Sequence, residues 1–172
     1  MKEHITTCVT GLAWMGSGIG SIESAMERLF REATNEIMIT SYAISNATDG
    51  LLEWFELALS RGILVKMVIN HLAEQPDDVV VKMFRLGRNY PHFKLYDFTG
   101  DEENDLHAKA IVVDRRLALI GSSNLSRRGL LTNHELAILI EGTSVGEVAQ
   151  ALDKLLASHM VKEVQFLRNG QV

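Results

Sequence analysis

Residues 106–124 read LHAKAIVVDRRLALIGSSN, and this stretch determines how the second half of the chain folds. Two apolar runs, residues 108–113 and 117–120, have the composition of short strands, and the polar DRR between them is typical of a turn. The pattern therefore predicts a β-hairpin. In a hairpin the start of the first strand pairs with the end of the second, so the residues around position 107 should lie beside those around position 122.

Four polar side chains are expected at the open end of this hairpin. Because side chains alternate faces along a strand, His107 and Lys109 point the same way, while Ser122 and Asn124 follow the second strand directly. The group combines an imidazole, an ammonium, a hydroxyl and a carboxamide. No cysteine or second histidine accompanies it in the sequence, so it is unlike a zinc site, and we predict neither a metal nor a cofactor.

This combination of groups suits a phosphodiester. Lys109 and Asn124 can bind the non-bridging oxygens of phosphate, and the Ser122 hydroxyl can add a donor. Histidine is largely neutral at pH 7, and a neutral imidazole such as that of His107 can attack phosphorus. A covalent intermediate would divide one difficult hydrolysis into two easier displacements.

The spacing of the stretch resembles the HKD signature of the phospholipase D superfamily, which reads here His107-x-Lys109-x4-Asp114-x6-Gly121-Ser122-x-Asn124. The chain carries one copy, whereas the lipid-cleaving members carry two in a longer chain. It is therefore most similar to the small single-motif members, the Nuc-type endonucleases. This resemblance implies an α-β-α sandwich and an activity that needs no metal.

The resemblance also implies roles for individual residues. In that family the histidine is the nucleophile and the lysine and asparagine bind phosphate, which here are His107, Lys109 and Asn124. A downstream acidic residue orients the histidine, and Glu135 stands eleven residues after Asn124, where that residue is expected. An unpaired carboxylate beside apolar neighbours is costly, so we expect Glu135 to bond a ring nitrogen of His107. Two copies of the motif build one active site, which implies a homodimer.

Two interpretations remain open for the charged residues around the motif. Asp114 either belongs to the site or binds backbone N–H groups or an arginine within the turn, and its position favours the structural role. Five basic residues and one acidic residue lie between positions 106 and 130. Four of the basic residues are arginines, namely Arg115, Arg116, Arg127 and Arg128. They either form a patch for the phosphates beside the scissile bond or are solvated turn charges. We assign Arg127 and Arg128 to phosphate binding.

Other titratable residues are expected to lie outside the site. His134 is adjacent to Glu135 but faces the opposite side of its strand, and His92 should be on the surface. His71 ends a strand and either lines the cleft or, as we favour, lies on the surface. The acidic loop of residues 99–105 lacks the spacing of an EF-hand, so it predicts solvated carboxylates rather than a calcium site.

The remainder of the chain alternates between strand and helix patterns. The alternation predicts one α/β domain, residues 1–172, with a mixed, largely parallel β-sheet and helices on both faces. The clearest helix has apolar residues at i, i+4, i+7 and i+8, namely Ile22, Met26, Leu29 and Phe30. The expected strands are 5–10, 36–44, 63–69, 93–98 and 135–140, the helices are 22–33, 51–60, 78–86 and 143–160, and residues 161–172 form a short strand or tail.

Composition bounds the class of protein. The 172 residues are 47% hydrophobic and 23% charged, as in ordinary globular domains. A net charge of −5 gives no general attraction to nucleic acid, and 6% aromatic residues offer no evident base-stacking platform. Cys8 is the only cysteine, which excludes an internal disulfide and favours a cytoplasmic location. No run approaches the ~18 apolar residues of a membrane span, and residues 1–20 resemble part of the fold more than a signal peptide.

These observations lead to one main hypothesis and two alternatives. The main hypothesis is a metal-independent phosphodiesterase, a DNA endonuclease that works through a phosphohistidine in a dimeric composite site. The first alternative is a catalytically weak nucleic-acid-binding module of a restriction or phage-defence complex, which the acidic composition supports and the intact motif opposes. The second is a phosphatidyl-transfer enzyme, for which the sequence offers no amphipathic lipid-facing stretch.

Overall fold

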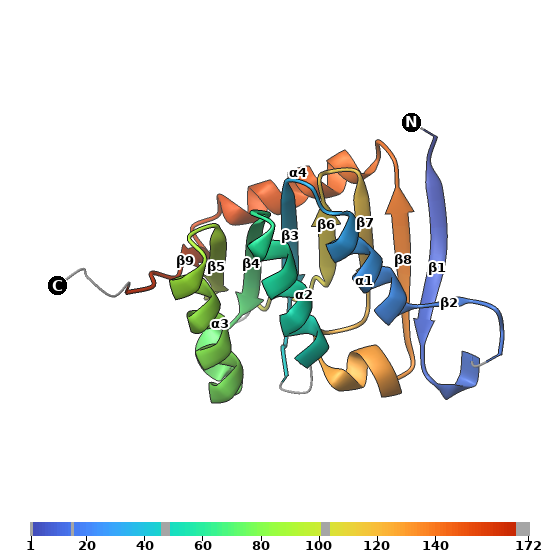
Figure 1. Cartoon of the computed structure of the whole chain (residues 1–172), viewed down its shortest axis with the longest axis horizontal. Coiled ribbons are helices and arrows are strands. Elements are labelled where there is room, and N and C mark those ends of the chain that lie inside the picture. The colour runs from blue at the N-terminus through green and yellow to red at the C-terminus, as the bar shows by residue number, and fades with distance from the viewer. Residues whose placement is uncertain (1, 15, 46–48, 101–103, 168–172) are drawn as a thin grey trace.

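A computed structural model describes residues 2–14, 16–45, 49–100 and 104–167. Within these residues nine strands form one sheet in the order β2-β1-β8-β7-β6-β3-β4-β5-β9 (Figure 1). The strands are β1 (His4–Thr10), β2 (Gly20–Ser21), β3 (Glu36–Ser41), β4 (Leu64–Asn70), β5 (Phe93–Phe98), β6 (Ala110–Val113), β7 (Leu117–Gly121), β8 (Glu135–Glu141) and β9 (Val161–Glu163).

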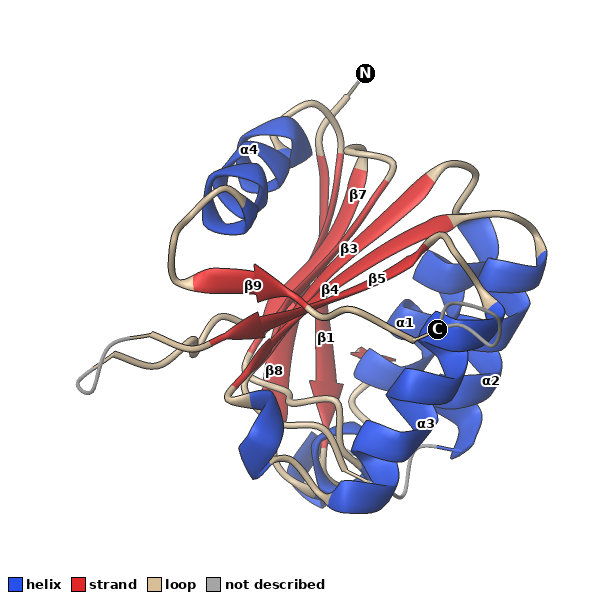
Figure 2. Ribbon diagram, turned by 90° about the vertical axis from the view of Figure 1, so that its left-hand side faces the viewer, coloured by secondary structure: helices blue, strands red, loops and turns tan. Residues whose placement is uncertain are grey.

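Helices cover both faces of the sheet, as the sequence predicts. Figures 1 and 2 show α1, α2 and α3 together on one face and α4 alone on the other. They are α1 (Ile22–Glu32), α2 (Asp49–Ser60), α3 (Asp77–Asn89) and α4 (Val145–Leu156), with short helical turns η1 (Leu12–Trp14), η2 (Leu72–Glu74) and η3 (Arg128–Thr132). None of the helices in the described ranges has the length and apolar character needed to cross a membrane.

The sheet is mixed, but its parallel part is smaller than the sequence suggests. Strands β3, β4 and β5 pair in parallel, and so does the short β2 with β1. The other pairs are antiparallel. Between β5 and β8 the described chain has no crossover helix. It runs through the β6–β7 hairpin into β8, and adjacent strands joined in that way are antiparallel. After β8, α4 crosses the sheet to β9.

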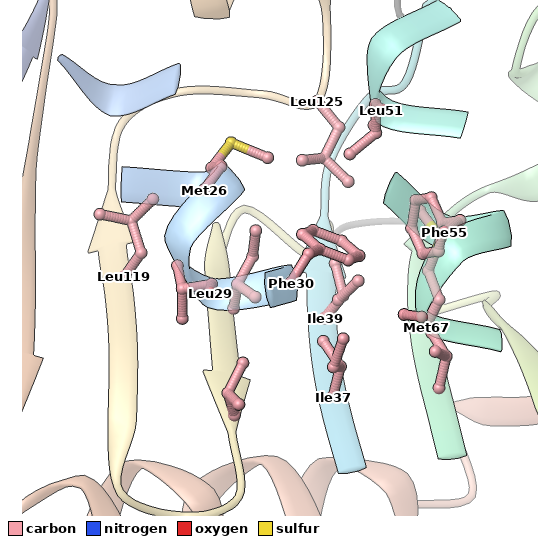
Figure 3. Close-up of a cluster of buried hydrophobic side chains, with 14 of the residues drawn as sticks. Met26, Leu29, Phe30, Ile37, Ile39, Leu51, Phe55, Met67, Leu119 and Leu125 are labelled. Atoms are coloured by element: carbon pink, nitrogen blue, oxygen red, sulfur yellow. The ribbon is translucent and has the colours of Figure 1, made fainter. Parts of the chain in front are cut away.

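The larger hydrophobic core lies between the sheet and the first three helices (Figure 3). Phe30 of α1 meets Phe55 of α2 edge-on, with ring centroids 5.3 Å apart. Both rings are buried above Ile39 and Met67, which belong to the parallel strands. The stripe predicted for α1 is buried, and Ser21 caps this helix by accepting a hydrogen bond from the Ser24 amide.

Several strands begin or end at the lower side of the sheet in Figure 1. This row of strand ends is here called the site edge. Strands β3, β4 and β5 end there, while β6 and β8 begin there, because β6 is antiparallel to β3 and β8 is antiparallel to β7. The register places Thr40 opposite Ala110 and Ala110 opposite Ile120. The residues that follow β3 and β4 therefore flank the residues that precede β6.

The acidic loop that the sequence singles out lies partly outside the described residues, which do not include Asp101, Glu102 and Glu103. Strand β3 is also shorter than the predicted 36–44. It ends at Ser41, where the Oγ hydroxyl donates to the carbonyl oxygen of Ala43 and turns the chain out of the sheet.

Candidate active site

The predicted hairpin is confirmed, and it supplies the framework of the site. Ala110 pairs with Ile120 and Val113 pairs with Leu117. The pairing continues beyond β6, because the Gly121 amide donates to the Lys109 carbonyl over 3.1 Å. The open end of the hairpin thus places Lys109 beside the Gly-Ser-x-Asn segment.

His107 and Lys109 touch each other at the site edge. The Nζ atom of Lys109 lies 3.2 Å from Nδ1 of His107. An ammonium can only donate, so Nδ1 accepts and the neutral ring carries its proton on Nε2. The imidazole is exposed and the lysine half-buried, so a ligand can reach both.

Sequence reasoning missed Tyr42, which contacts both groups. Its ring stacks on the His107 imidazole, with centroids 4.3 Å apart and planes 28° apart. The Lys109 Nζ lies 5.5 Å from the centre of the same tyrosine ring. Tyr42 falls inside the predicted strand 36–44, where only the long-range pairing of β3 with β6 could have revealed this contact.

Ser122 and Glu135 are brought together, but through different contacts than the sequence predicts. The Ser122 hydroxyl donates to the Glu135 carboxylate and its oxygen accepts from the Leu136 amide, 3.2 Å away. Asn133 donates to the other carboxylate oxygen over 3.3 Å. The hydrogen bonds recorded for Glu135 in the described chain do not include His107, so its orienting role stays a prediction.

Asn124 lies in the loop after β7 and has an unusual amide. Its Oδ1 atom is buried and has no hydrogen-bond partner among the described residues. Leaving a buried acceptor without a donor is costly, so this oxygen is a point of unsatisfied polarity in the loop. The loop itself is tightly packed, because a Cβ atom on Gly129 would lie 2.6 Å from the Asn124 carbonyl oxygen. Within the described chain, Asn124 makes no recorded contact with His107.

A second cluster missed by sequence reasoning holds the chain just before the motif. Asn70, only 2% exposed, donates to Asp105 over 3.0 Å and accepts from the Leu106 amide over 2.8 Å. His71 Nε2 lies 3.1 Å from the same Asp105 oxygen. The hydrogen bond from Asn70 lowers the pKa of Asp105, and the neighbouring His71 adds to this against the opposing effect of burial. His71 is therefore half-buried at the site edge and not on the open surface.

Asp114 lies at the far end of the hairpin, away from His107. Its carboxylate accepts hydrogen bonds from the amides of Thr34, Asn35 and Glu36 at 2.8–2.9 Å, and from the Thr34 hydroxyl. Burial alone would raise the pKa of Asp114, but these hydrogen bonds outweigh it and the pKa is lowered. Asp114 ties the turn to the loop before β3, so we leave it out of the candidate site.

Replacing Asp114 with asparagine should destabilise the fold and leave the site intact. We expect the free energy of unfolding to fall by about 1–3 kcal/mol, because bonds to a charged acceptor are lost. The pKa of Asp114 is lower in the folded chain than in the unfolded chain. Its contribution to stability should therefore be complete above the unfolded pKa of about 4 and should be lost as the pH falls from there through the folded pKa. Urea denaturation at several pH values measures this. Equal stability of the two proteins at pH 7 would contradict it, and Glu53→Gln, at an exposed position of α2, is the control.

The four arginines near the motif do not form one patch, which corrects that interpretation. Arg115 and Arg116 belong to the distant turn, because the hairpin separates its turn from its open end. Arg115 pairs with Glu36 and Asp153 at 2.8 and 2.7 Å. Arg127 and Arg128 are exposed in the segment after Asn124, and their contact with phosphate stays a prediction.

His134 has local contacts of its own. Its ring lies 5.6 Å from that of Trp14, and its Nε2 atom accepts from the Ala13 amide over 3.1 Å. His92 is half-buried, with its Nε2 atom 2.7 Å from the Leu59 carbonyl oxygen, and not on the surface as predicted. Within the described residues, no group of three or more histidine, cysteine, aspartate or glutamate side chains is arranged to hold a metal ion.

Comparisons with known sequences agree with the motif. A family model described as "Cardiolipin synthase, PLD-like domain" matches residues 26–160. The DISARM protein DrmC of Bacillus paralicheniformis is 29% identical over 144 residues, which cover 82% of this chain and 58% of that protein. Cardiolipin synthase A of Buchnera aphidicola from Schizaphis graminum is 30% identical over 138 residues, 77% of this chain and 27% of that protein. The chain thus spans between about a quarter and three fifths of these relatives.

Solved structures share the fold. Nuc from Salmonella typhimurium, described as a phospholipase D family member, superposes with a TM-score of 0.75 at 17% identity, covering 95% of this chain and 99% of that chain. The phosphatidylserine synthase of Haemophilus influenzae gives the same TM-score of 0.75 at 16% identity, with 95% of this chain and 40% of that chain covered. At such identities the similarity concerns the fold alone.

Proposed function

Because the chain belongs to the phospholipase D superfamily, we propose that it is a metal-independent phosphodiesterase that cuts DNA as an endonuclease. One observation carries this proposal. The imidazole of His107 and the ammonium of Lys109 are in contact at an exposed sheet edge, directly beside the segment that carries Ser122 and Asn124. A nucleophile and anion-binding groups are the parts that phosphoryl transfer requires.

The chemistry begins with a shift of Lys109. A bound phosphate attracts the ammonium away from Nδ1 of His107, so the ring proton can move to Nδ1 and free the electron pair of Nε2. Nε2 then attacks phosphorus, and a P–N bond forms as the bond to the leaving oxygen breaks. Lys109 and the carboxamide of Asn124 bind the equatorial oxygens, where negative charge develops.

The leaving oxygen needs a proton, and we propose that a second copy of the chain supplies it. A second His107 on the other side of the phosphate, which enters the step as an imidazolium, protonates the oxygen; the neutral ring that results later takes a proton from the attacking water. His71, which contacts Asp105 at the site edge, is the alternative acid if one chain suffices. Three exposed leucines at the site edge support a partner chain that covers this edge. Leu12, Leu131 and Leu136 expose 77%, 48% and 48% of their surface.

The choice of DNA rests on resemblance and on local charge. Arg127 and Arg128 are exposed beside the motif, where they can contact phosphates on either side of the scissile bond. The net charge of −5 opposes any general attraction to nucleic acid, so binding should depend on this local pair.

The two alternatives each have a relative in their favour. The similarity to the DISARM protein DrmC supports a module that serves a larger complex. The similarity to cardiolipin synthase A supports phosphatidyl transfer. Both relatives are longer than this chain, so neither decides between the three functions.

A substrate panel in excess EDTA tests the proposal. We expect duplex DNA to be cleaved at an unchanged rate, because His107 supplies the nucleophile that a metal-bound hydroxide would otherwise provide. The panel should include single-stranded DNA, RNA, bis(p-nitrophenyl) phosphate and phosphatidylglycerol vesicles, with His107→Ala as the blank. Loss of cleavage in EDTA and recovery with Mg²⁺ would contradict the mechanism. Turnover of the vesicles alone would favour phosphatidyl transfer, and DNA binding without turnover would favour the binding module.

A further inference from the structure

Tyr42 lies outside the motif, yet it contacts both of the motif's reactive groups. We propose that Tyr42 is a positioning residue, which holds the His107 imidazole in its plane and stabilises the positive charge that this ring acquires during phosphoryl transfer. The proposal rests on the proposed function, since it assigns Tyr42 to the step that His107 performs.

The geometry is that of a stacked pair. The two rings are 4.3 Å apart with an angle of 28° between their planes, so the imidazole lies over the tyrosine face and not at its edge. That face carries the negative part of the ring quadrupole. The Lys109 ammonium, 5.5 Å from the ring centre, lies close to the same ring. One aromatic ring thus contacts both the imidazole and the ammonium.

The backbone on either side of Tyr42 is held in place. Gln75 donates to the Tyr42 carbonyl over 3.3 Å and accepts from the Ile44 amide over 3.0 Å. One residue further on, the Ser45 amide donates to the Leu125 carbonyl, which follows Asn124 directly. The half-buried tyrosine is therefore a fixed support, connected through Leu125 to the loop that carries the phosphate-binding residues.

The charge on His107 changes during the reaction, which gives the stack a catalytic consequence. When Nε2 forms the P–N bond and Nδ1 keeps its proton, the ring becomes a cation. The leaving oxygen departs with the bonding electrons and takes its proton from the second imidazole. A tyrosine face attracts a cationic ring more strongly than a neutral one, so the contact favours the transition state over the bound substrate. Other charges facing His107 are Lys109 and Asp105, and both act from outside the stack.

A second tyrosine–histidine contact provides a matched control. Tyr90 meets His92 with centroids 5.8 Å apart and planes at 72°, an edge-on arrangement. These residues precede β5 and lie at the sheet edge opposite to the site. Truncating Tyr90 removes a half-buried tyrosine ring and its contact with a histidine, as truncating Tyr42 does, but it leaves the candidate site unchanged.

The test compares Tyr42→Phe, Tyr42→Trp and Tyr42→Leu with Tyr90→Leu, using bis(p-nitrophenyl) phosphate or plasmid in EDTA. The loss of a cation–π contact corresponds to about a 3- to 30-fold fall in kcat for Tyr42→Leu, with KM nearly unchanged. Phenylalanine and tryptophan keep the aromatic face and should retain most of kcat. Tyr90→Leu should match the wild type. A folded Tyr42→Leu protein with wild-type kcat would overturn the assignment, and so would a Tyr42→Phe protein as slow as Tyr42→Leu.

A second readout does not depend on activity. The ring current of a stacked tyrosine shifts the C–H proton resonances of His107 upfield, and NMR should show this in wild type and Tyr42→Phe but not in Tyr42→Leu. A wild-type spectrum without the shift would overturn the stack itself. If the shift is present but the wild type cleaves no phosphodiester, the proposed function fails and the catalytic role of Tyr42 fails with it. If the wild type is active and Tyr42→Leu equals it, only the role of Tyr42 fails.

Discussion

Replacing His107 with alanine is expected to reduce phosphodiester cleavage by roughly 10⁴-fold or more, the scale of loss when a covalent nucleophile is removed. The remaining groups could still bind phosphate, but the other described imidazoles at the site edge are already engaged: Asp105 holds His71, and His134 accepts a backbone hydrogen bond. The His107 ring is exposed, so its removal should leave the fold intact.

Single-turnover cleavage and thermal unfolding should be measured on the same preparation. His4→Ala is the matched control, because it truncates an exposed histidine at the start of β1, opposite Glu141 and so at the end of the sheet away from the site edge. Quenching the wild-type reaction in alkaline denaturant should trap an adduct on His107 that is stable in base and labile in acid. Cleavage by His107→Ala at a rate near that of the wild type would exclude the covalent mechanism, whatever the substrate.

Local spacing was sufficient to predict the hairpin and the meeting of its ends. Both strands and the turn lie within residues 106–124, so neither loop closure nor distant pairing had to be inferred. The α1 stripe was equally local, and it is confirmed. Features that depend on a few neighbouring residues can be derived from the sequence with elementary geometry.

The parts that could not be predicted depend on which distant strands become neighbours. Tyr42 reaches His107 only because β6 inserts beside β3, a pairing between segments about 70 residues apart in sequence. Asn70 reaches Asp105 and Leu106 for a similar reason, from the end of β4. No periodicity in either segment carries this information. The half-buried position of His71 results from the same strand order. The sequence does not show that order, so it favoured a surface position for this residue.

The arginines show the converse case, in which neighbours in sequence are not neighbours in space. Arg115 and Arg116 are close to the motif along the chain, but they occupy the turn of the hairpin whose open end holds His107. The acidic partners of Arg115 come from other elements, Glu36 at the start of β3 and Asp153 in α4. Charge counted along a hairpin therefore overestimates the charge at either end.

The composite site makes a quantitative prediction about mixed subunits. If each active site needs a nucleophile from one chain and an acid from the other, a heterodimer of wild-type and His107→Ala chains should be inactive. After equal amounts are unfolded together and refolded, only about a quarter of the dimers carry two wild-type chains, so activity should fall to about a quarter of that of the same total concentration of wild type. Independent sites would instead leave about half.

The same mixing experiment with His4→Ala should leave activity unchanged, which controls for losses during refolding. Sedimentation at micromolar concentration should show twice the mass of one chain for wild type and for both variants. The prediction connects to the structure through the three exposed leucines at the site edge, which a second copy could cover. A monomer with full activity, or a mixture that retains half, would require the acid to come from within one chain. His71 would then be the residue to examine, because the strand order brings its imidazole to this edge beside Asp105.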